Sequence, residues 1–203
     1  MRHDFFLELA LNQFLDADDA YVELMGLTNQ EPDDDTYELV DAICNQCIET
    51  ICFTVMALES YINTFSAAFI SESFAESIDR LDVPAKWTVA MKMYSGIDLL
   101  KGQAPLQGIY KCTRIRNSFM HSKSKQLLQN EDSCITIPQL DLYKDYMLPA
   151  YEALTTIADI SEWIEKNCPS VTVNICDGIR EYITCQFKKT RKSWYFNEPT
   201  VMF

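Results

Sequence analysis

Glycine, proline and histidine are scarce in this chain, and each scarcity excludes a class of protein. Only 5 Gly and 7 Pro occur among 203 residues, which excludes collagen-like and low-complexity disordered proteins. With 2 His there is no set of metal-ligand histidines, and a Gly-rich phosphate loop and a serine elbow are also missing. These absences argue against zinc-enzyme, P-loop, kinase and serine-hydrolase functions. The remaining composition, 48% hydrophobic and 12% aromatic, suffices for the core of one domain.

Targeting and membrane patterns are missing as well. The first residues include Asp4 and Glu8, where a signal peptide carries cations followed by an apolar stretch. The longest apolar run, Ile51–Leu58, is interrupted at Thr54 and is too short to cross a bilayer. We therefore expect a cytoplasmic protein that does not contact a membrane.

The 8 cysteines form no paired CxxC…CxxC or Cys/His set, so the sequence predicts no metal centre and no cofactor. We interpret them as small buried hydrophobic residues in a reducing compartment. Cys44 and Cys47 do form one CxxC, but it lies inside a helical pattern with no βαβ context. This position favours core filling over redox chemistry.

Hydrophobic residues recur at steps of three and four along most of the chain, which is the spacing of amphipathic helices. The longest such stripe starts near Thr36 and reaches the Ser66–Ser71 region. Strand patterns are confined to Ser133–Ile137, which alternates briefly, and to Val171–Lys192, most of which keeps helical steps and is assigned to helix. The other expected helical segments are 5–15, an acidic continuation that ends near Gly26, 73–81, 84–102, 105–122, and 139–166 with a kink at Pro149.

These patterns predict an all-α fold, an antiparallel helical bundle with at most a short extended segment. We expect residues 1–203 to form a single helical domain. Within it, residues 166–203 would supply a C-terminal helix and an aromatic tail, and Trp194, Tyr195 and Phe196 of that tail would dock on the bundle or form a dimer contact.

The formal net charge of −13 is unevenly spread along the chain. Residues 1–85 hold 2 basic and 18 acidic side chains, residues 86–125 hold 8 and 1, and residues 126–203 hold 7 and 11. We call the middle segment the basic island; its cations are Lys86, Lys92, Lys101, Lys111, Arg114, Arg116, Lys123 and Lys125. Two interpretations stay open: these cations pair with acidic residues of the same chain or of a partner, or they bind phosphates.

The basic island also contains the side chains best suited to chemistry. Asn117 lies one helical turn before His121 and would fix its tautomer by a hydrogen bond. Arg116 falls on the apolar line of the same helix, where a buried cation needs a partner. Glu59, at the edge of the long helical stripe, is the expected partner, with Asn63 one turn further. With one such helix from each of two protomers, Arg116 and His121 would flank a groove that holds a nucleic-acid phosphate.

The segment Arg116-Asn117-Ser118-Phe119-Met120-His121 resembles the Arg-x4-6-His motif of the HEPN (higher eukaryotes and prokaryotes nucleotide-binding) superfamily, in the form with Asn directly after Arg. Residues 57–63, which read Ala-Leu-Glu-Ser-Tyr-Ile-Asn, are similar to the acidic, Asn-containing segment of an earlier helix in several of those families. The resemblance covers about residues 36–165, which would form the HEPN-like core.

The resemblance implies a small helical bundle that often dimerises and, in active members, a metal-independent endoribonuclease of toxin–antitoxin or antiviral defence systems. His121 would act as general acid and base, and Arg116 would stabilise the pentacoordinate phosphate. Asn117 would orient the site, and Glu59 would position Arg116. The ribose 2′-hydroxyl would attack the adjacent phosphate and leave a 2′,3′-cyclic end. RNA contacts are expected from Lys111, Arg114, Lys123 and Lys125.

The partners that the resemblance implies are RNA, a second copy of the chain, and an antitoxin protein of the nucleotidyltransferase type. A non-enzymatic function stays open beside this one. In it, a HEPN-like or unrelated helical module binds a nucleotide or a protein, and Arg116 and His121 are structural. An exposed His121 in a groove with Arg116 would favour the ribonuclease, and a fully buried His121 would favour the binding module.

Overall fold

The computed structural model describes residues 3–27, 33–120, 142–168 and 170. Within these ranges the chain is helical and contains no strand, which confirms the all-α bundle. The helices are α1 His3–Gly26, α2 Asp34–Phe69, α3 Glu72–Ile78, α4 Val83–Ser95, α5 Ala104–Met120, the π-helix η2 Tyr143–Met147, and α6 Leu148–Asn167. The expectations for Ser133–Ile137, Val171–Lys192 and the aromatic tail fall outside the described residues.

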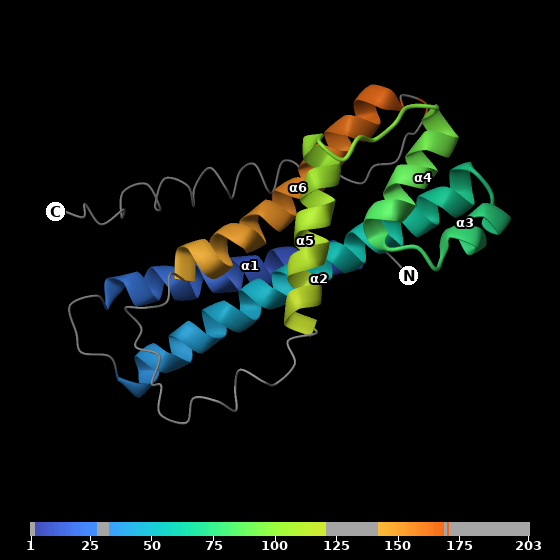
Figure 1. Cartoon of the computed structure of the whole chain (residues 1–203). Helices are drawn as coiled ribbons and strands as arrows, with labels where there is room; N and C mark the ends of the chain where they lie inside the picture. The colour runs from blue at the N-terminus through green and yellow to red at the C-terminus, as the bar shows by residue number, and fades with distance from the viewer. Residues whose placement is uncertain (1–2, 28–32, 121–141, 169, 171–203) are drawn as a thin grey trace.

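Helix α2 is the centre of the bundle. Each of the other described helices contacts it: α1 runs along its first half, α5 crosses it, and α3 and α4 pack near its end (Figure 1). Its buried residues, from Val40 to Ser66, recur at steps of three and four, as the sequence predicts. By length and composition α2 also passes the test for a membrane span, with a mean hydropathy of 1.4 over 18 residues. The central helix of a bundle accounts for that hydropathy, because its apolar face packs against other helices.

Side-chain caps fix where the helices begin. Asp33 accepts a hydrogen bond from the backbone N–H of Thr36 at 3.0 Å, and the Thr36 hydroxyl accepts one from the backbone N–H of Asp33 at 3.4 Å. The hydrogen bonds from Thr36 lower the pKa of the Asp33 carboxyl. Ser71 and Asp82 cap α3 and α4 by accepting one hydrogen bond each, from the backbone N–H groups of Phe74 and Ala85. The Asp33 cap starts α2 at Asp34, two residues before the expected start.

The end of α4 differs from the prediction. The helix stops at Ser95, because Gly96 adopts a left-handed conformation with φ 72° and donates its N–H to the Lys92 carbonyl oxygen at 2.9 Å. The sequence placed the end at Gly102, since Ile97 and Leu100 continue the amphipathic spacing. Both of these side chains are exposed outside the helix.

The first and last described helices also refine the expectations. Helix α1 is continuous from His3 to Gly26, so the two segments expected there form one helix. Pro149 is the second residue of α6, which continues directly from η2, so it offers no N–H to the preceding turn. The irregularity expected at Pro149 precedes it as the π-helix η2.

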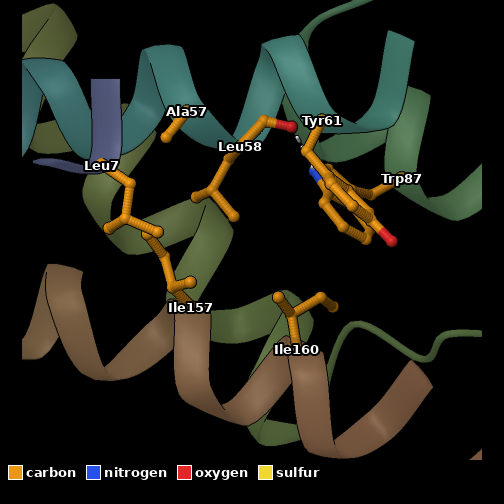
Figure 2. A pocket seen from close by; sticks show the side chains of 7 residues that line it. All are labelled: Leu7, Ala57, Leu58, Tyr61, Trp87, Ile157 and Ile160. Carbon is orange, nitrogen blue, oxygen red and sulfur yellow. Dashed lines mark hydrogen bonds between the residues drawn. The ribbon is translucent and has the colours of Figure 1, made fainter. Parts of the chain in front are cut away.

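Aromatic and aliphatic side chains from four helices meet in the core (Figure 2). Trp87 stacks on Tyr61 with ring centroids 5.5 Å apart and donates its indole N–H to the Leu58 carbonyl oxygen at 3.2 Å. Leu7 of α1 and Ile157 of α6 close the other side of a cavity of about 20 Å³. The tight packing leaves no room for a ligand here.

Replacement of Gly96 with alanine tests the end of α4. Gly96→Ala should lower the free energy of unfolding by about 1 kcal/mol, because a Cβ disfavours the left-handed conformation. Gly102→Ala is the matched control: Gly102 has no positive φ and no atom within 4 Å of a Cβ, so it should change stability by less than about 0.5 kcal/mol. Urea titrations of the two variants measure both values. Equal effects would contradict the assigned helix end.

Candidate functional site

Arg116 and Asn117 form a polar pair near the end of α5. Arg116 is half-buried, and its Nε and Nη2 groups donate hydrogen bonds to Asn117 Oδ1 at 3.1 Å and 2.9 Å. A guanidinium carries five N–H groups, so three of them have no hydrogen bond to a residue that the structure describes. The Asn117 amide thus holds the guanidinium through two of its five donors. His121, Lys123 and Lys125 lie outside the described residues.

The positive charge of Arg116 affects the pKa of two thiols, Cys52 and Cys112. Burial raises the pKa of Cys112 to about 12 and also raises that of Cys52, and the Arg116 charge lowers both in part. The charge therefore lies near Cys52 on α2. Glu59 is seven residues further along that helix, which is about 10 Å at 1.5 Å per residue. Cys52 and Glu59 therefore lie about two turns apart on α2.

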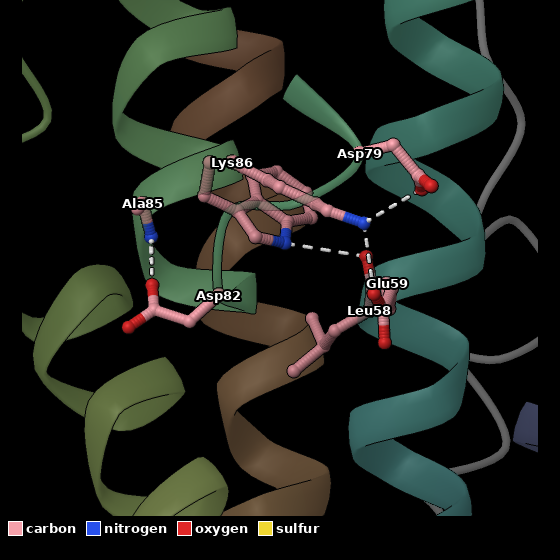
Figure 3. Close-up of polar contacts among 7 residues, drawn as sticks. Leu58, Glu59, Asp79, Asp82, Ala85 and Lys86 are labelled. Atoms are coloured by element: carbon pink, nitrogen blue, oxygen red, sulfur yellow. Dashed lines mark hydrogen bonds and ion pairs between the residues drawn. The ribbon is translucent and has the colours of Figure 1, made fainter. Parts of the chain in front are cut away.

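Glu59 pairs with Lys86 instead, so the expected Glu59–Arg116 ion pair is wrong (Figure 3). Lys86 Nζ lies 2.8 Å from Glu59 Oε1 and 3.5 Å from Asp79 Oδ1. The lysine side chain is 1% exposed, whereas those of Glu59 and Asp79 are 36% and 75% exposed. A buried ammonium needs such a partner, so Glu59 serves to hold α4 against α2. Asn63 lies one turn beyond Glu59 and thus further from Arg116.

Most described cations of the basic island have partners inside the chain. Lys92 pairs with Asp98 at 2.8 Å, Lys111 pairs with Glu152 of α6, and Lys101 lies over the Tyr110 ring at 5.0 Å. Arg114 is exposed and forms no ion pair with any residue in the described ranges. The intrachain-pairing interpretation therefore holds for Lys86, Lys92 and Lys111. Phosphate binding by the island stays a prediction, and Arg114 and Arg116 have no ion pair with a residue in the described ranges.

A polar groove between α5 and α6 was not anticipated from the sequence. It has a volume of about 330 Å³ and is lined by residues that include Gln107, Lys111, Glu152 and Asp159. Burial raises the pKa of the Asp159 carboxyl, and the charge of Glu162 raises it further. Because Lys111 and Glu152 are 41 positions apart, no local spacing predicts their meeting.

Gly108 accounts for the close approach of the two helices at this groove. A Cβ at Gly108 would lie 2.4 Å from Thr156 Oγ1 on α6, which is closer than atoms can pack. The glycine thus serves helix packing, and the groove lies around this contact. In the described ranges no three His, Cys, Asp or Glu side chains gather where a metal ion could bind them.

No family model, no curated protein and no solved structure matches this chain. The likeness to the HEPN superfamily therefore rests on the residues quoted for it and stays a prediction.

Substitution of Glu59 tests its reassigned role. Glu59→Gln should lower the free energy of unfolding by about 2 kcal/mol, less than for a fully buried pair because Glu59 is partly exposed. For a chain of this size the loss corresponds to a melting temperature about 4–8 °C lower. Asp79→Asn is the matched control and should change stability by no more than about 1 kcal/mol, since Asp79 is mostly exposed. A Glu59→Gln protein as stable as the wild type would contradict this role.

Proposed function

We propose that the chain is a metal-independent endoribonuclease of the HEPN type, in a toxin–antitoxin or antiviral defence system. The observation that carries the proposal is the geometry of Arg116: it is half-buried, its guanidinium is held by Asn117, and three of its N–H donors have no hydrogen-bond partner among the described residues. A preorganised guanidinium of this kind suits the negative charge that develops on a phosphate during cleavage. The all-α bundle agrees with the fold that the family resemblance implies.

The proposed reaction is a transfer within the RNA strand. His121 takes the proton of a ribose 2′-hydroxyl, and the oxygen attacks the adjacent phosphorus to form a pentacoordinate species. Arg116 stabilises the added charge. The bond to the 5′-oxygen then breaks, that oxygen receives a proton, and the products are a 2′,3′-cyclic phosphate and a 5′-hydroxyl. No step requires a metal ion.

The roles proposed for Glu59 and Asn117 differ from those that the sequence predicts. Asn117 orients Arg116 directly, through the two hydrogen bonds to its amide oxygen. Glu59 acts at a distance: its ion pair with Lys86 holds α4 on α2, the helix beside which Arg116 lies. Asn63 lies one turn beyond Glu59 on α2.

Few cations would contact the RNA in this proposal. Arg114 is exposed without an ion pair in the described ranges, and Lys123 and Lys125 supply the rest, whereas Lys111 must first leave Glu152. A homodimer in the cytoplasm would bring two such helices to one phosphate. The acidic first third of the chain suits an antitoxin with a basic surface.

A second candidate function is a non-catalytic helical module that binds a nucleotide or a protein. The neutralisation of Lys86, Lys92 and Lys111 inside the chain favours it, because fewer cations remain for an RNA backbone. In this case Arg116 is structural, and Arg116→Ala mainly lowers the melting temperature.

RNA cleavage by purified variants separates the two functions. Arg116→Ala and His121→Ala should each reduce the cleavage rate by about 10²–10⁴, because they remove charge stabilisation and proton transfer. Their melting temperatures should stay within about 2 °C of the wild type. Lys92→Ala is the matched control, since this exposed cation already pairs with Asp98 and should leave the rate unchanged. Unchanged cleavage in both site variants would contradict the proposal.

A further inference from the structure

Two sulfur atoms meet between α2 and η2, and a third sulfur-bearing side chain lies on the same face of α2. The Sγ atom of Cys47 lies 3.5 Å from the Sδ atom of Met147, although the two residues are 100 positions apart. Cys44 precedes Cys47 by three residues on α2, which places its side chain on the same helix face. Cys44 also shares a side-chain hydrogen bond with Tyr146, the neighbour of Met147. Both helices therefore direct a pair of side chains at this point.

The local backbone is unusual where Met147 joins the cluster. Residues Tyr143–Met147 form a π-helix, a rare element that occurs frequently at functional sites. Its last two residues contact the two cysteines of α2, so the irregular turn and the sulfur cluster coincide. Cys47 and Met147 are 0% exposed, whereas Cys44 and Tyr146 are half-buried and open the cluster toward solvent.

The ligand chemistry selects among metal ions. Thiolate and thioether sulfurs are soft ligands that favour Cu(I), while Mg²⁺ and Ca²⁺ require oxygen ligands and a structural Zn²⁺ site takes four ligands. Three sulfurs placed about 2.3 Å from one ion stand about 4 Å apart. The separation of 3.5 Å between Cys47 Sγ and Met147 Sδ is close to this value. We propose that Cys44, Cys47 and Met147 bind one Cu(I) ion.

Binding of the ion must displace two protons. Burial, with smaller contributions from Cys44 and Asp18, raises the pKa of Cys47 to about 12. Burial raises the pKa of Cys44 as well, with a smaller contribution from Asp41, while its hydrogen bond with Tyr146 lowers it. Both groups are therefore neutral thiols without the metal, and Cu(I) replaces their protons, which leave to solvent. Affinity should fall as pH falls, by up to about 100-fold per pH unit for two released protons.

Competition with a chromogenic Cu(I) chelator tests the site in the reduced full-length protein without oxygen. The wild type should withdraw one Cu(I) ion per chain. Met147→Leu removes the thioether at nearly constant volume, and Cys44→Ser removes the half-buried thiol; each should weaken binding at least about 10-fold. Cys52→Ser is the matched control, because Cys52 is an equally half-buried thiol of α2 outside the cluster. It should bind Cu(I) as the wild type does.

Two results would overturn the proposal. One is a wild-type protein that leaves Cu(I) on the chelator. The other is equal binding by the wild type, Met147→Leu and Cys44→Ser, which would assign the ion to other thiols. Circular dichroism of each variant confirms that the helices are retained, and X-ray absorption of the loaded wild type should show three sulfur ligands. The Cu(I) site does not rest on the proposed ribonuclease function.

Discussion

The burial of one face of α2 is the constraint on which the rest of the structure depends. Every other described helix packs against α2. The residues of α2 that each helix contacts therefore determine where its functional side chains lie. The sulfur cluster lies near Cys44 and Cys47, the Arg116 guanidinium lies near Cys52, and the buried ammonium of Lys86 meets Glu59 two turns later. The two proposed sites and the ion pair thus occupy successive levels of one helix.

Local patterns predicted most of the fold, because caps and amphipathic spacing act over a few residues. The stripe of α2 and the first-turn proline of α4 are such signals. The end of α4 was placed too late, since Ile97 and Leu100 kept the helical spacing beyond the left-handed Gly96. Pairings between distant elements carry no local signal. Arg116 lies on an apolar line of its helix in the sequence, and only the packing of α4 shows that Lys86 is the cation that reaches Glu59.

The structure shows which of the described charged residues pair with one another. A net charge of −13 disfavours a protein that binds nucleic acid through its overall field, whereas the basic island favours local phosphate contacts. Among its described cations, Lys86, Lys92 and Lys111 are neutralised by carboxylates, while Arg114 and Arg116 form no ion pair within the part of the chain that the structure describes. An RNA strand would therefore be held by few contacts around one phosphate, and its binding should weaken steeply with salt.

The chemistry of the cut ends tests the central claim most directly. Purified wild-type protein is incubated with total RNA and a set of transfer RNAs in the presence of a chelator, and the ends of the fragments are mapped chemically. The account predicts 2′,3′-cyclic phosphates and 5′-hydroxyls, because the 2′-oxygen is the nucleophile and no metal ion takes part. Fragments that end in a 3′-hydroxyl and a 5′-phosphate, or no cleavage of any of these RNAs, would contradict it.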